Sequence, residues 1–131
     1  MMGLRTCGLS LAALFGMSAA ITSFGHHSQS EFDFRNLMEV EGTVTELIWK
    51  SPHAWLHVDI VAEDGEVVNW GWELPSPTTL MRRVWTRKSL VPGDVVTVNG
   101  APARNHTAIG YARTIRDAEG NGVFTGITDV N

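Results

Sequence analysis

Histidines are the residues in this sequence whose type and spacing most clearly predict chemistry. The five are His26, His27, His53, His57 and His106. Neutral imidazole is a common ligand for late transition metals, and histidines without thiolates favour copper, zinc or nickel. His26 and His27 are adjacent, His53 lies in a turn, and His57 lies on the polar side of the segment that follows. We predict that these four residues form a metal site, with copper as the first choice and zinc or nickel as alternatives. His106 stands alone in a loop and is a weaker candidate.

The geometry of this site depends on where the chain begins after export. Residues 9–21 are a mainly apolar run that follows Arg5. The run is shorter than the roughly 20 residues of a membrane-spanning helix and is typical of a cleaved signal peptide. We expect residues 1–25 to be removed, and a retained anchor is the alternative. Cleavage before His26 would place a free amine and an imidazole on one residue, so that both bind one ion. Cleavage before Ile21 would remove that possibility.

The cleavage site also decides how copper would be held. If Gly25 becomes the first residue, Gly-His-His places a histidine third, and the amine with backbone nitrogens would bind Cu(II) in a square plane. The alternative interpretation needs no metal: the histidine pair is then an ordinary polar stretch beside a cleavage site. In that case His53 hydrogen-bonds turn carbonyls and His57 is an ordinary strand residue.

Cysteine content and charge narrow the class of protein. Cys7 is the only cysteine and lies within the segment expected to be removed, so the mature chain offers no thiolate ligand and no disulfide. Removal of Arg5 leaves nine basic against 14 acidic residues, a net charge of −5. An acidic exported chain is a poor candidate for nucleic acid. We predict a periplasmic or secreted bacterial protein that is not embedded in the membrane, with a periplasmic protein or a small ligand as its partner.

Alternating apolar and polar residues predict a β-rich domain. Asp64-Gly65 between two such segments is typical of a hairpin turn. Ser76 and Pro77 are typical of a helix start, and apolar residues at 80, 81, 84 and 85 would form its buried stripe. We expect strands at 37–49, 54–61, 67–74, 95–103, 111–118 and 123–127, and one helix at 75–90.

The order of these elements predicts the fold. Three strands, a helix and two or three further strands match a small Greek-key barrel of the OB type, with five to six strands and the helix between strands 3 and 4. A two-layer α+β sandwich is the competing architecture. The domain is expected to span residues 37–131 and to follow a polar arm at 26–36. Trp70 and Trp72 share a strand face and are expected to fill the barrel.

Several segments together resemble a family of small exported bacterial proteins without an established function. These segments are HHS, GTV, PHAW, NWGWELPSP, RRVWTRKSLVPGD and VTVNGAPAR. The resemblance implies export and a barrel-like β domain, and it implies no reaction. The helix segment of that family usually reads Arg-x-Gly-Trp-Thr-Arg, whereas this chain has Val84 in place of the glycine.

We expect a binding module rather than an enzyme. The carboxylates of Glu46, Asp59 and Glu73 are spread over strands and form no recognisable acid/base pair. The first alternative is a structural or protein-interaction module without metal, whose aromatic surface is formed by Trp49 and Trp55. The second is a small oxidative enzyme built on the same metal. The basic residues of the helix segment are expected to be its solvated face, with an anionic ligand or partner as the alternative.

Overall fold

The computed structural model describes residues 29–126, which form six strands, one α-helix and a short 3₁₀ turn. All six expected strands are present, within two residues of their predicted bounds. The elements are the 3₁₀ turn Gln29–Glu31, β1 Met38–Ile48, β2 Trp55–Val61, β3 Val67–Glu73, α1 Pro77–Arg82, β4 Val95–Pro102, β5 Ile109–Asp117 and β6 Gly122–Thr125.

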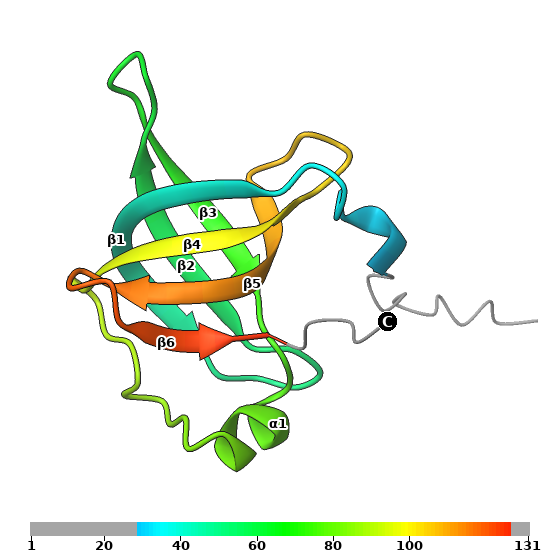
Figure 1. Cartoon of the computed structure of the whole chain (residues 1–131), viewed down its shortest axis with the longest axis vertical. Coiled ribbons are helices and arrows are strands. Elements are labelled where there is room, and N and C mark those ends of the chain that lie inside the picture. Colours follow the sequence, from blue (N-terminus) through cyan, green and yellow to red (C-terminus); the bar gives the residue numbers. More distant parts are fainter. Residues whose placement is uncertain (1–28, 127–131) are drawn as a thin grey trace, which may run out of the picture.

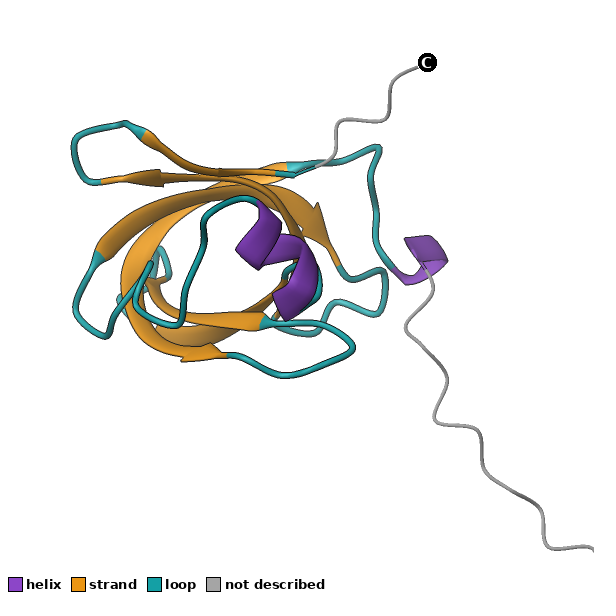
Figure 2. Ribbon diagram, turned by 90° about the horizontal axis from the view of Figure 1, so that it is seen from below, coloured by secondary structure: helices purple, strands orange, loops and turns teal. Residues whose placement is uncertain are grey.

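The sheet closes on itself. Its strand order is β3-β2-β1-β4-β5-β6, and an additional parallel pairing joins β3 to β5. Five strands therefore form a closed barrel, with β6 added alongside β5 (Figure 1). Figure 2 shows α1 lying across one end of this barrel. The expected mainly-β, OB-like barrel with its helix between strands 3 and 4 is confirmed, and the competing sandwich is not formed. Closure pairs both edges of each barrel strand.

The barrel interior is filled by the apolar residues of the alternating strands. Leu56, Val58 and Trp72 are fully buried. Trp72 fills the barrel as expected, whereas Trp70 is only half-buried and stacks on it with ring centres 5.4 Å apart. Two glycines make room for Trp72. A Cβ added at Gly110 would lie 2.3 Å from the Cζ3 atom of Trp72, and a Cβ added at Gly100 would lie 2.6 Å from the same atom. The large indole therefore fits only because two neighbouring strand positions carry no side chain.

Helix α1 is shorter than predicted, and the expected helix over 75–90 is wrong beyond Arg82. In one continuous helix, residues 80 and 85 would point about 140° apart, so they could not face the same core. The chain instead turns at Val84, whose φ is 65°. Leu80 and Trp85 are both buried as a result, whereas Met81 and Val84 are 56% and 88% exposed.

Residues 31–34, which precede β1, pack against the outside of the barrel. Phe32 is buried and pairs with Ala103 in an isolated β-bridge. Its ring and that of Phe34 lie 5.8 and 5.5 Å from the ring of Tyr111 on β5. The backbone of Arg104 donates to the carbonyl of Glu31 at 2.9 Å. Within the range 29–126, no helix has the length and apolar character needed to cross a membrane.

Candidate functional site

The β1–β2 loop brings His53 to the end of β3. The backbone of Leu74 donates to the Ala54 carbonyl at 2.9 Å, which holds the loop there. The Nδ1 atom of His53 lies 3.2 Å from Oε1 of Glu73 and 3.3 Å from the carbonyl oxygen of Leu74. Both neighbours only accept hydrogen bonds at this atom, so Nδ1 carries the hydrogen and donates. In the neutral ring the Nε2 atom then has a free lone pair, on a side chain that is 35% exposed.

Glu73 is a buried carboxylate. It is only 2% exposed, although it alternates with the inward-facing Trp72 and Leu74 and so belongs to the outer face of β3. A buried carboxylate is costly unless it has a hydrogen-bonded partner, and the His53 ring is one such partner. The strand pattern alone predicts no partner for Glu73. The observed hairpin has a three-residue loop at 63–65, closed by the Ala62 backbone donating to the Glu66 carbonyl at 2.8 Å. This register pairs Glu73 with Trp55, close to His53, whereas a two-residue turn at Asp64-Gly65 would have paired Glu73 with Leu56.

His57 is held in a second hydrogen-bonded group on the outer face. Its Nδ1 atom lies 2.9 Å from Oδ1 of Asn69. The Asn69 amide nitrogen donates to Asp59 at 2.7 Å and to Thr45 at 3.0 Å. A carboxylate only accepts, so Asp59 fixes the amide with its oxygen toward His57. His57 then donates through Nδ1, and its Nε2 atom also has a free lone pair.

The two barrel histidines are anchored at separate points of β3. Strand register places Glu73 opposite Trp55 and Asn69 opposite Asp59, so His53 and His57 bind residues four apart on β3. The described chain contains no group of three His, Cys, Asp or Glu side chains placed to hold one metal ion. His26 and His27 lie outside the described residues.

The two tryptophans of the predicted aromatic surface have different surroundings. Trp49 is half-buried and packs against the barrel core. Trp55 is half-buried on the outer face. A Cβ added at Gly71 would lie 3.6 Å from the Trp55 ring and 3.4 Å from the His57 ring. Trp55 and His57 therefore both lie over the β3 backbone at Gly71.

Two hollows of the described surface lie away from these histidines. Both are about 460 Å³ and lie beside Arg104, one lined by Phe32 and Ile109 and the other by Trp70 and His106. Neither is lined by His53, Glu73 or His57.

Comparison with known proteins identifies a family without a function. A family model described as a family of unknown function, DUF6152, matches residues 15–112. No curated protein matches the chain. Two crystal structures of TiaS bound to an isoleucine tRNA align with it, the complex with ATP at 21% identity and the complex with AMPCPP and agmatine at 23%, each with a TM-score of 0.46. Each alignment covers 63% of this chain and 18% of the other, so the likeness carries no argument about function.

Proposed function

This chain belongs to the DUF6152 family, whose function is unknown, and from its own residues we propose that it is an exported binding module for copper or another divalent metal ion. The expected membership of a family of unknown function is confirmed. The proposal rests on one observation, the His53 ring held through Nδ1 by Glu73 and the Leu74 carbonyl. In this proposal His53 supplies a nitrogen ligand from the barrel.

The surroundings of His53 are those of a metal-binding imidazole. A histidine that binds a metal commonly donates its other ring hydrogen to a carboxylate or a backbone carbonyl, which fixes the tautomer and makes the ring more basic. His53 has both kinds of acceptor within 3.3 Å, and the carboxylate is buried. Its Nε2 atom therefore has a fixed direction and a free lone pair before any ion arrives.

The amino-terminal histidines would complete the site. Phe32 packs on Tyr111, and Tyr111 lies opposite Glu73 in the pairing of β5 with β3. From β5 to β2 is two strand spacings, about 10 Å. The five peptide units between His27 and Phe32 can span up to about 17 Å, so the chain is long enough to bring the histidine pair to His53.

The proposed ligand set consists of nitrogen atoms. His26 would supply its amine and ring if cleavage falls before it, and His53 would supply a third nitrogen. His27 and His57 are alternative rings. Imidazole and amine nitrogens suit Cu(II), and also zinc and nickel. Because only neutral imidazole binds a metal, acid would release the ion.

Two measurements test the proposal. The intact mass of the exported protein gives the first residue, and a start at His26 or Gly25 is expected. Copper titration of that protein should show tight binding that His53→Ala weakens. His106→Ala is the matched control, because His106 lies in the β4–β5 loop outside the proposed site. A start at Ile21, with equal affinity in the two variants, would contradict the proposal.

A second candidate function needs no metal. Trp55 is half-exposed over Gly71 on the same outer face, and aromatic rings so placed are common in surfaces that bind partner proteins. The chain would then be a periplasmic interaction module. Metal analysis of protein purified from the periplasm separates the two functions, because only the first predicts a bound ion.

A further inference from the structure

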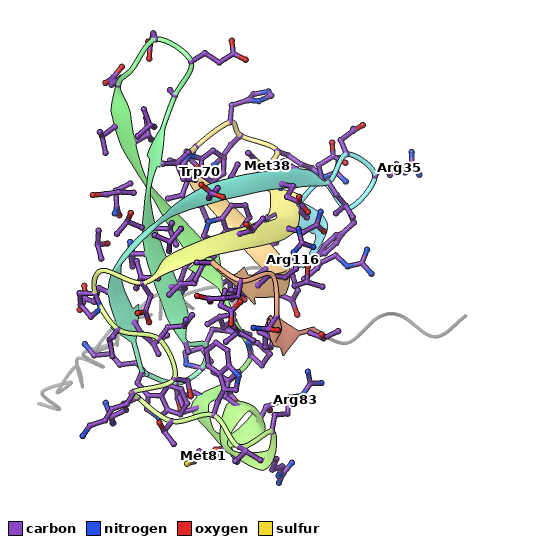
Figure 3. All side chains as sticks on the ribbon, turned by 60° about the vertical axis from the view of Figure 1, so that its left-hand side comes forward. Arg35, Met38, Trp70, Met81, Arg83 and Arg116 are labelled. Atoms are coloured by element: carbon purple, nitrogen blue, oxygen red, sulfur yellow. The ribbon has the colours of Figure 1, made fainter. Side chains whose placement is uncertain are left out.

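The end of the molecule at α1 carries exposed apolar and basic side chains together. Met81 is 56% exposed and Val84 is 88% exposed, the highest value among the large apolar residues of the described chain. Four exposed basic residues lie between these two or within four residues after Val84 in the sequence. These are Arg82, Arg83, Arg87 and Lys88. We call residues 81–88 the α1 knob. Figure 3 shows Met81 and Arg83 at the helix end of the molecule.

The structure around Trp85 holds Val84 outward. The Trp85 backbone donates to the Leu80 carbonyl at 3.0 Å, and its indole donates to the Val123 carbonyl at 3.0 Å. Between these anchors Val84 has a φ of 65°, a region that β-branched residues rarely adopt. Its side chain projects into solvent because its neighbour is fixed in the core. Exposure of an apolar side chain here is therefore built into the fold.

Charge is separated along the long axis of the molecule. The chain as a whole has a net charge of −4. The tip of the β2–β3 hairpin carries exposed acidic residues at 63, 64 and 66 and lies at the opposite end from α1 (Figure 1). Among the knob's cations, Arg83 donates to the Thr125 carbonyl and lies 6.0 Å from the centre of the Phe124 ring. The charged groups of Arg82, Arg87 and Lys88 form no ion pair within the described chain.

We propose that the α1 knob docks on the surface of an anionic lipid bilayer. Helix α1 projects beyond the end of the barrel (Figure 1), so a rigid partner would need a matching cavity, whereas lipid headgroups adapt to such a projection. Met81 and Val84 would enter the headgroup boundary while the arginines and lysine contact lipid phosphates. The acidic hairpin tip would point away from the negatively charged surface. An acidic protein is the competing partner, and the test below distinguishes it.

Vesicle co-sedimentation tests the proposal with the exported full chain. Vesicles of equal parts phosphatidylglycerol and phosphatidylcholine should bind the protein, and vesicles of phosphatidylcholine alone should not. Each basic residue near such a surface changes binding about fivefold, so Arg82→Gln with Arg87→Gln should weaken it about 30-fold. The control pair, Arg35→Gln with Arg116→Gln, changes the net charge equally at positions away from the knob (Figure 3) and should have little effect.

The apolar contact is tested by Val84→Asn. Asparagine tolerates a positive φ better than valine, so this variant should fold at least as well. Loss of the valine side chain that enters the bilayer should weaken vesicle binding about tenfold. The proposal is overturned if the wild-type chain does not bind the anionic vesicles, or if both arginine pairs weaken binding equally. It is also overturned if the knob binds soluble polyglutamate and not the vesicles, which would indicate an acidic protein.

Discussion

Replacing Glu73 by glutamine should weaken metal binding without weakening the fold. Glutamine has nearly the same shape and keeps an oxygen that can accept from Nδ1 of His53, now 3.2 Å from the carboxylate. The substitution removes the charge and replaces one acceptor oxygen with an amide nitrogen that only donates. Because Glu73 is 2% exposed, loss of the buried charge removes a desolvation cost that offsets the cost of burying the new amide nitrogen, so the free energy of unfolding should stay about equal.

The magnitude follows from the kind of hydrogen bond that is lost. A bond to a charged group contributes about 1 kcal/mol more than a bond between neutral groups, and that difference corresponds to about a fivefold change in affinity. Removing the partner altogether, in Glu73→Ala, leaves His53 with only the Leu74 carbonyl at 3.3 Å. Loss of such a supporting residue typically costs roughly 10- to 100-fold in metal affinity. The two variants should therefore form a graded series.

Competitive copper titration, paired with thermal unfolding of the metal-free chain, measures both effects. The expected result is about a fivefold loss of affinity for Glu73→Gln at unchanged stability, and a larger loss for Glu73→Ala. Wild-type affinity in both variants would refute the reasoning, because His53 would then need no carboxylate to act as a ligand. A glutamine variant that loses affinity only in proportion to lost stability would refute it equally.

Three further predictions concern the fold. Val84→Gly should stabilise the chain by about 1 kcal/mol and raise Tm by about 4–8 °C. Glycine adopts the positive φ of this residue without strain, and little packing is lost because the valine side chain is already 88% exposed. An unchanged or lower Tm in calorimetry would contradict this. Gly110→Ala should destabilise by about 2 kcal/mol in urea unfolding, because its Cβ would lie 2.3 Å from Trp72, whereas Gly122→Ala, with nothing within 4 Å, should change little. The pKa of the Asp117 carboxyl is lowered from 3.8, chiefly by a hydrogen bond from the Asn121 side chain. The stability that Asp117 contributes is therefore complete above pH 3.8 and is lost as the pH falls through the lower pKa of the folded state. A carboxyl NMR titration with a midpoint at or above 3.8 would contradict this.

The strands and their order could be predicted because local pattern determines them. Alternation in β2 and β3 identifies Leu56, Val58 and Trp72 as interior residues, and the structure buries all three. The helix begins as predicted, with Ser76 accepting from the backbone of Thr79 at 3.3 Å. Its end could not be predicted in this way. The end depends on a bond from the Trp85 indole to Val123, a contact between residues far apart in the chain.

In the candidate site, too, the residues in the local pattern could be predicted and the contacts between distant residues could not. The number and spacing of the histidines predicted roles for His53 and His57. Each ring forms its hydrogen bonds through Nδ1, and Nε2 forms none of them. The buried partner of His53 was not predicted. Alternation assigns Glu73 to a polar face, and its burial arises only when the β1–β2 loop folds back onto the end of β3. A single strand pattern contains no information on that closure.

The number of imidazoles bound to copper shows whether His53 is a ligand. Pulsed EPR of the Cu(II)-loaded exported protein counts coordinated imidazole rings, and the same measurement on His53→Ala gives the contribution of the barrel. We expect one imidazole fewer in the variant than in the wild-type protein, with an amino-terminal ring retained in both. An identical count in the two proteins would contradict it, because copper would then be held without the residue that Glu73 and Leu74 orient.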